Sequence, residues 1–212
     1  MNIKEKFNNE FWIFFDVGST LIDESVAYNH RIQDMIAGTR LSLEEVYKKR
    51  LEFSQQGLDG NSEIISYYGL KKTPWHSDDE RPYSDAQKVL EHLKDRGYKL
   101  GIIANQISGL ADRLNNWGMA NYFSVIASSS DLGVSKPNCK IFEKALSMAG
   151  CKVCNSVMIG DRLDNDIIPA KQCGMQTIWL KNGLASYQPR ELGNGYADMI
   201  IESLTELINI LI

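Results

Sequence analysis

Short apolar runs alternate with amphipathic segments along most of this chain, and this rhythm limits its possible folds more than any other feature. The apolar runs are short enough for buried strands, and the segments between them repeat apolar residues at helical spacing. We expect strands at 99–104, 123–127, 156–159, 176–180 and, at an edge, Ile200 and Ile201. We expect helices after the Ser84/Gln87 capping box, at 109–117, 138–148 and 166–173, and in the tail 204–212. This order predicts an α/β fold with a parallel sheet and helices on both faces.

The apolar run at residues 11–15 adds one more expected strand, and it ends at Asp16. Asp16 precedes a loop that contains Gly18, so its carboxylate lies at the carboxyl end of the sheet. Open α/β folds bind their ligands at that edge. An aspartate in this place can act as a nucleophile, a metal ligand or a loop cap.

Residues 22–81 break the rhythm, because they contain helical stripes and no convincing strand. Ser42 and Glu45 form a capping box ahead of one such stripe. Pro82 marks the return to the alternating pattern. We therefore expect an α/β core of residues 1–21 and 82–212, with residues 22–81 as a small all-helical inserted domain.

Composition and charge exclude several classes of protein. The 212 residues carry a net charge of -4, whereas a nucleic-acid-binding protein would show a basic stripe. No apolar run approaches the ~20 residues that cross a membrane. The first residues show no apolar signal region, so we expect a cytoplasmic protein whose four cysteines are reduced thiols.

Zinc has little support in the sequence. Cys151 and Cys154 form a C-x-x-C pair without a second pair, which favours a turn over a metal site. His30, His76 and His92 share no metal-ligand spacing and are expected at the surface or in the core.

The ends of the expected strands carry the residues that point to chemistry. Asp16, Lys136, Asp161 and Asp166 converge on one edge of the sheet, near Asn105. Clustered carboxylates repel one another unless a cation lies among them, and oxygen ligands of this kind suit Mg²⁺. A lysine facing them would neutralise an anionic substrate. Together these groups predict phosphoryl transfer through an aspartyl-phosphate.

Four motifs in this order resemble those of the haloacid dehalogenase superfamily. The family's D-x-D-x-[TV] motif corresponds to the segment from Asp16 to Thr20, and its second motif to the strand that ends at Ala104 and Asn105. Its lysine before a proline corresponds to Lys136, and its G-D-x-x-x-x-D motif runs from Gly160 to Asp166. The resemblance implies a Rossmann-like core with a helical cap at 22–81.

The resemblance also implies roles. Asp16 would be the nucleophile of a Mg²⁺-dependent phosphatase that acts on a small phosphorylated molecule. The metal ligands would be Asp16, the backbone carbonyl of Gly18, Asp161 and Asp166. Lys136 would stabilise the phosphoryl group, and groups near Ala104 and Asn105 would bind its oxygens. Arg162 and Asp164, within the fourth motif, are expected to face solvent.

Two positions depart from the family pattern. Gly18 stands where the family has an aspartate that works as general acid and base, a function worth ~10²–10⁴-fold. Ala104 stands where the family has a hydroxyl that binds the phosphoryl group, a bond worth ~1.5–3 kcal/mol. On this basis we expect a preference for acyl and aryl phosphates, which depart without protonation. Thr20 or a residue of the inserted segment could supply the missing proton.

Two alternatives stay open, and a third fits poorly. The departures at Gly18 and Ala104 also suit a silenced member that binds a phosphorylated ligand or a protein. A dehalogenase would lack the second aspartate too, but would not need the metal that the acidic fourth motif suggests. A receiver-type domain fits poorly, since its acidic pair precedes the nucleophile. We expect a monomer or a homodimer, with the tail 204–212 as a packed helix or a dimer contact.

Overall fold

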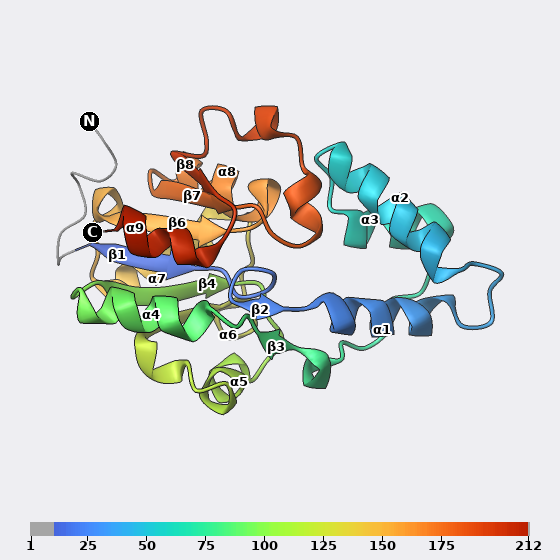
Figure 1. Ribbon diagram of the computed structural model, residues 1–212, viewed down its shortest axis with the longest axis horizontal. Coiled ribbons are helices and arrows are strands. Elements are labelled where there is room, and N and C mark those ends of the chain that lie inside the picture. Colours follow the sequence, from blue (N-terminus) through green and yellow to red (C-terminus); the bar gives the residue numbers. More distant parts are fainter. Residues whose placement is uncertain (1–10, 212) are drawn as a thin grey trace.

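The computed structural model describes residues 11–211, and a six-stranded parallel sheet forms its centre (Figure 1). Its strands are β1 (Trp12–Phe15), β4 (Lys99–Ala104), β5 (Phe123–Ser128), β6 (Ser156–Gly160), β7 (Gln176–Leu180) and β8 (Met199–Ile201). They lie in the order β5-β4-β1-β6-β7-β8, and every neighbouring pair is parallel. The predicted α/β fold is therefore confirmed, including its edge strand. Because β1 lies between β4 and β6, the loops after these three strands are neighbours.

Helices cover both faces of the sheet. The longer ones are α4 (Ala86–Asp95), α5 (Leu110–Asn116) and α7 (Cys139–Ala149), and the shorter ones are α6 (Ser129–Leu132), α8 (Ile168–Gln172) and α9 (Leu207–Ile210). Ile13 and Phe15 of β1 belong to the hydrophobic core shared with α4, α5 and α9. Trp12 and Phe14 belong to the core shared with α7 and α8. Alternate side chains of one strand point to opposite faces, so β1 contributes to both cores.

Short helical turns join these elements. They are η2 (Ser77–Asp79), η3 (Ala120–Tyr122), η4 (Val153–Asn155), the π-helical turn η5 (Leu163–Ile167), η6 (Leu184–Tyr187), η7 (Arg190–Gly193) and η8 (Leu204–Glu206). The helix expected at 166–173 is thus a π-helical turn followed by α8. The tail is a short turn followed by α9, and its final residue lies outside the described part.

The inserted segment forms three helices beside the sheet, α1 (Ser25–Ile36), α2 (Leu43–Gln55) and α3 (Gly60–Tyr68) (Figure 1). Their apolar residues make a separate small cluster around Ile32, Val46 and Ile64. The expectation of no strand in this segment is wrong at its ends. There β2 (Ile22–Asp23) pairs antiparallel with β3 (Arg81–Pro82). The pairing arises because the chain leaves and re-enters the core at adjacent points.

The two predicted capping boxes have different outcomes. Ser42 and Glu45 form the complete box at the start of α2. The box of Ser84 and Gln87 is wrong, because Asp85 is the N-cap residue of α4 and makes no side-chain cap. The Gln87 amide donates instead to the Trp117 carbonyl oxygen at 2.9 Å. The Gln87 side chain therefore makes a tertiary contact with Trp117 and does not form the predicted cap.

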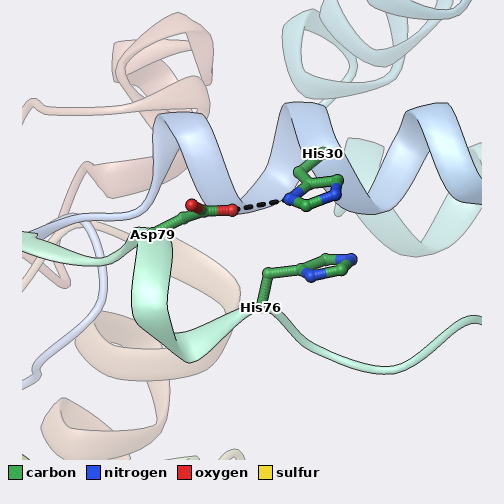
Figure 2. Close-up of side chains that lie close together, drawn as sticks. All are labelled: His30, His76 and Asp79. Carbon is green, nitrogen blue, oxygen red and sulfur yellow. Dashed lines mark hydrogen bonds and ion pairs between the residues drawn. The ribbon is translucent and has the colours of Figure 1, made fainter.

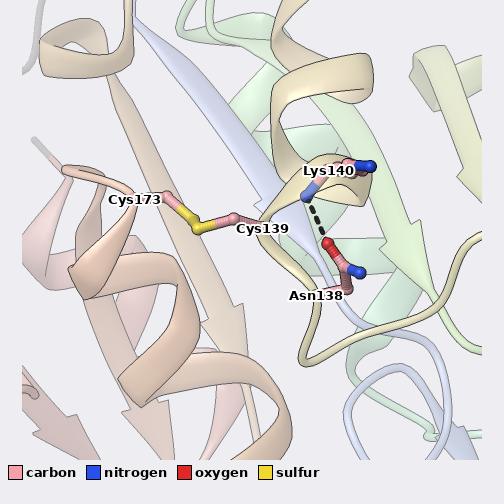
Figure 3. The surroundings of a disulfide bond; sticks show 4 residues. All are labelled: Asn138, Cys139, Lys140 and Cys173. Carbon is pink, nitrogen blue, oxygen red and sulfur yellow. Dashed lines mark hydrogen bonds between the residues drawn. A yellow bond between two sulfur atoms is a disulfide. The ribbon is translucent and has the colours of Figure 1, made fainter.

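Cys139 and Cys173 form a disulfide, with 6.1 Å between their Cα atoms (Figure 3). The expectation that all four cysteines are reduced is therefore wrong for this pair, whereas Cys151 and Cys154 are free. Cys139 begins α7 and Cys173 follows α8, and these two helices pack together. Their separation of 34 residues hides this proximity in the sequence.

A search of the described residues for a helix long and apolar enough to span a bilayer finds none.

Candidate active site

Asp16 lies directly after β1, at the carboxyl edge of the sheet. Its backbone N–H donates to the Ile159 carbonyl oxygen of β6 at 2.9 Å, which continues the strand pairing by one residue. A tight loop then turns the chain, since the N–H groups of Leu21 and Ile22 both donate to the Val17 carbonyl oxygen at 2.9 and 3.0 Å. The Asp16 side chain is buried. The sheet and this loop therefore fix its position from both sides.

The end of β6 brings two more carboxylates to the same place. Asp161 follows Gly160, and Asp166 lies in the π-helical turn η5. The Arg162 backbone N–H donates to Asp166 Oδ2 at 3.0 Å. A Cβ at position 160 would lie 2.5–2.6 Å from Asp166 side-chain atoms, so this glycine allows the close approach. Trp179 of β7 donates to the Asp161 carbonyl oxygen at 2.6 Å and so supports the loop.

Lys136 connects the carboxylates. Its buried Nζ lies 2.5 Å from Asp16 Oδ1 and 2.5 Å from Asp166 Oδ1. Asn105, after β4, holds the lysine backbone through two hydrogen bonds. Its Oδ1 accepts from the Lys136 N–H at 2.8 Å, and its Nδ2 donates to the Lys136 carbonyl oxygen at 2.9 Å. The fold thus brings together Asp16, Asn105, Lys136, Asp161 and Asp166, as the strand ends suggested.

The charges of this cluster do not balance. One oxygen from each of Asp16, Asp161 and Asp166 lies within 4.8 Å of the others, whereas Lys136 supplies one positive charge. Burial, and then the charge of Asp166, raise the pKa of Asp16 to about 6, although Lys136 opposes the shift. Burial and the two neighbouring carboxylates raise the pKa of Asp161 well above its usual value. A divalent cation bound by these oxygens would relieve the repulsion, so the donor set fits such an ion.

A cavity of about 490 Å³ lies over this cluster. Asp16, Gly18, Asn105 and Asp161 line it from the sheet edge, and Lys136 is buried outside its lining. The inserted helices and the segment 181–188 complete the lining. The Ser54 hydroxyl of α2 donates to the Leu184 carbonyl oxygen at 2.7 Å, which joins these two walls. Ala104, fully buried, carries no polar side-chain group toward the cavity.

The cavity wall also contains residues that sequence reasoning placed elsewhere or did not select. The expectation that Arg162 and Asp164 face solvent is wrong, because Arg162 lines the cavity and pairs with both Asp164 and Asp59. Both are half-buried, because Asp59 at the start of α3 contacts Arg162 and the Gln188 side chain contacts Asp164. Tyr28 of α1 lines the cavity, and so does buried Arg50 of α2. Each depends on how the inserted helices sit on the core, which no local pattern shows.

Glu24 is the most unusual member of the wall. It lies between β2 and α1, is 8% exposed, and lines the cavity. Burial, and then the charges of Asp16 and Glu80, raise the pKa of its carboxyl to about 8. No motif or spacing includes Glu24, so sequence reasoning missed it.

A second cluster lies apart from the cavity. The rings of His30 and His76 stack with centroids 3.6 Å apart, and Asp79 lies beside them (Figure 2). Asp79 Oδ2 is 2.8 Å from His30 Nδ1, and Asp34 Oδ2 is 2.6 Å from His76 Nε2. Potential ligand atoms of His30, His76 and Asp79 lie within 4.8 Å of one another. Their sequence spacing shows no sign of this arrangement, which forms when the segment 76–79 packs on α1.

Known proteins resemble this chain over most of its length. Residues 13–180 match the family model described as haloacid dehalogenase-like hydrolase. A glyceraldehyde 3-phosphate phosphatase of Methanothermobacter thermautotrophicus is 30% identical over 227 residues, covering 94% of this chain and 98% of that protein. Another of the same name, from Pyrococcus furiosus, is 32% identical over 227 residues and covers 94% and 92% respectively.

A solved structure agrees with the sequence matches. The crystal structure of a HAD phosphatase from Thermococcus onnurineus superposes with a TM-score of 0.65 at 26% identity. The match covers 95% of this chain and 97% of that one.

Proposed function

This chain belongs to the haloacid dehalogenase-like hydrolase family, and from that premise we propose that it is a Mg²⁺-dependent phosphatase working through an aspartyl-phosphate on Asp16. The observation that carries the proposal is the placement of Lys136, 2.5 Å from the carboxylates of both Asp16 and Asp166 beneath a cavity. A nucleophile, a cation to balance the phosphoryl charge and a carboxylate cluster are the parts that this chemistry needs.

The contacts of each carboxylate and of Lys136 indicate its proposed role. Asp16 attacks phosphorus, and Lys136 holds its Oδ1 and offsets negative charge. Asp16, Asp161 and the Gly18 carbonyl would hold Mg²⁺, and Asp166, whose two oxygens accept from Lys136 and from the Arg162 N–H, would help to orient it. When bound, Mg²⁺ neutralises phosphoryl oxygens and the neighbouring carboxylates. Backbone groups at Ala104 and Asn105 bind the phosphoryl oxygens.

We propose that residues 22–81 act as a cap over the core and select the substrate. The cavity of about 490 Å³ suits a small metabolite, and Arg50, Arg162 and Lys181 add positive charge to its wall. The relatives named glyceraldehyde 3-phosphate phosphatase support a substrate of similar size and charge, such as a three-carbon phosphate.

The test is Mg²⁺-dependent hydrolysis of acetyl phosphate by wild type, by Asp16→Asn, and by Asp112→Asn, an exposed position on α5, as a control. We expect turnover that requires Mg²⁺, disappears with Asp16→Asn and persists with Asp112→Asn. Full activity of Asp16→Asn, or activity without a divalent ion, would contradict the proposal. Calorimetric Mg²⁺ binding without turnover by any variant would favour the silenced binding protein instead.

A further inference from the structure

We propose that Glu24 is the proton donor to the leaving group and later the base that activates water, in place of a side chain at position 18. The inference rests on the proposed phosphatase function. It would give this enzyme a complete acid/base apparatus built from a different part of the chain, the junction between β2 and α1.

The geometry at Gly18 carries the proposal. A Cβ added to Gly18 would lie 2.4 Å from Glu24 Oε2, 2.5 Å from Oε1 and 2.5 Å from the carboxyl carbon. The Glu24 carboxyl therefore fills the space that a side chain two residues after Asp16 would fill. It also lines the cavity above Asp16. A leaving-group oxygen on a phosphoryl group held at Asp16 would lie in this cavity.

A series of polar contacts holds the carboxyl there. The Gln106 side chain hydrogen-bonds to Glu24, and its Oε1 accepts from Arg113 Nη2 at 2.7 Å. Arg113 Nε lies 3.3 Å from Glu80 Oε2, and Glu80 Oε1 accepts from Trp75 Nε1 at 2.7 Å. Proton transfer needs a positioned group, and these contacts position one.

Two simpler explanations account poorly for this carboxyl. Glu24 is the N-cap residue of α1, but its side chain makes no capping hydrogen bond. Burying a carboxyl beside another is costly, so packing alone gives no reason for it. The other candidate for the missing proton, Thr20, is fully buried and does not line the cavity.

The reaction balances with these groups. In the first step the Asp16 carboxylate forms a bond to phosphorus while the bond to the leaving oxygen breaks, and the Glu24 carboxylic acid gives its proton to that oxygen. The products are an alcohol, the aspartyl-phosphate and a Glu24 carboxylate. In the second step a water oxygen bonds to phosphorus, Glu24 takes the water proton, and the bond to Asp16 breaks. Inorganic phosphate leaves and both side chains return to their starting states.

The test compares leaving groups that do and do not need a proton. For Glu24→Gln we expect kcat on an alkyl phosphate, glycerol 3-phosphate, to fall ~10²–10⁴-fold, with a loss below about tenfold on acetyl phosphate. Glu63→Gln on α3, outside the cavity lining, is the matched control and should keep the wild-type ratio of the two rates. Mg²⁺ affinity of Glu24→Gln, measured by calorimetry, should match that of wild type.

A rescue experiment tests whether the Glu24 carboxyl occupies the space that a side chain at position 18 would fill. Glu24→Ala should show the same selective loss, and adding Gly18→Asp to it should recover at least tenfold on glycerol 3-phosphate, because the removed carboxyl makes room. In the wild-type background Gly18→Ala should displace Glu24 and reproduce the selective loss.

The outcomes separate the two levels of inference. Failure of wild type to hydrolyse either substrate would contradict the phosphatase function itself. An active wild type whose Glu24→Gln variant loses both substrates equally, or binds Mg²⁺ more weakly, would overturn the role of Glu24 and assign it to metal binding or packing. An active wild type with no loss in Glu24→Gln would overturn it as well.

Discussion

Replacing Lys136 with methionine should destabilise the metal-free protein in a strongly pH-dependent way. The lysine side chain is fully buried, and its Nζ lies between Asp16 and Asp166 at 2.5 Å from each. Methionine keeps a similar length and apolar stem, so the packing cost is small. The main effect is that the carboxylates lose their cation. Breaking a buried ion pair in this way typically costs ~3–5 kcal/mol.

The pH dependence follows from the way the variant can relieve this cost, which is to bind a proton. At pH 7, about three units above an ordinary aspartate pKa, holding a proton on one carboxyl costs about 4 kcal/mol. At pH 5 the same proton costs about 1.5 kcal/mol. A carboxyl whose pKa is raised in the folded state contributes stability below about pH 4 and loses it as pH rises. Wild-type Asp16, with a pKa of about 6, already binds such a proton at pH 5 and carries about 3 kcal/mol of this cost at pH 7. Relative to wild type, the variant should therefore lose about 1.5 kcal/mol at pH 7 and little at pH 5.

Urea unfolding followed by tryptophan fluorescence, in EDTA at both pH values, measures these differences. Lys140→Met, an exposed change near the start of α7, is the matched control and should stay within ~0.5 kcal/mol of wild type. Added Mg²⁺ at pH 7 should recover part of the Lys136→Met loss, because it binds the same carboxylates. An equal loss at both pH values, or a loss below about 1 kcal/mol at pH 7, would refute the reasoning.

Three further measurements test other parts of the structure. Burial raises the pKa of Asp16 to about 6, so metal-free wild type should lose up to about 3 kcal/mol of unfolding free energy between pH 4 and 6. Urea unfolding at a series of pH values measures this loss, and an unchanged free energy of unfolding would contradict the charge imbalance. Thiol titration of the unfolded chain should find two reactive thiols before reduction and four after it. Four reactive thiols before reduction would exclude the disulfide. Replacing Cys139 and Cys173 with serine should lower the free energy of unfolding by about 4 kcal/mol, because the disulfide closes a loop of 34 residues and so reduces the entropy of the unfolded chain. In urea unfolding, Ser42→Ala should cost about 1 kcal/mol and Ser84→Ala less than about 0.5 kcal/mol, because Ser42 forms its capping box and Ser84 does not. Equal losses in the two variants would contradict this assignment.

Much of the core could be predicted because its signals are local. A buried strand needs a short apolar run and a covering helix needs a 3.6-residue stripe, and both patterns lie within about ten residues. The parallel arrangement then places the ends of neighbouring strands side by side, so Asp16, Asn105 and Asp161 could be grouped from the sequence alone. Their separation in the chain did not matter, since strand order alone brings them together.

Predictions for single side chains failed where the side chain contacts a residue far away in the sequence. The Ser84 capping box is a sound local pattern, yet Gln87 contacts Trp117 instead. Arg162 was expected to face solvent as a loop residue, whereas its guanidinium pairs with Asp59 at the start of α3.

By itself, then, the sequence determined the α/β rhythm, the positions of four motifs and the two departures at Gly18 and Ala104. Tertiary structure alone decided that Cys139 meets Cys173 and that the Glu24 carboxyl fills the space beside Gly18. The physical reason is that periodicity and capping depend on neighbours within a turn or two. The meeting of two distant loops depends instead on how whole helices pack, and a linear pattern does not encode that packing.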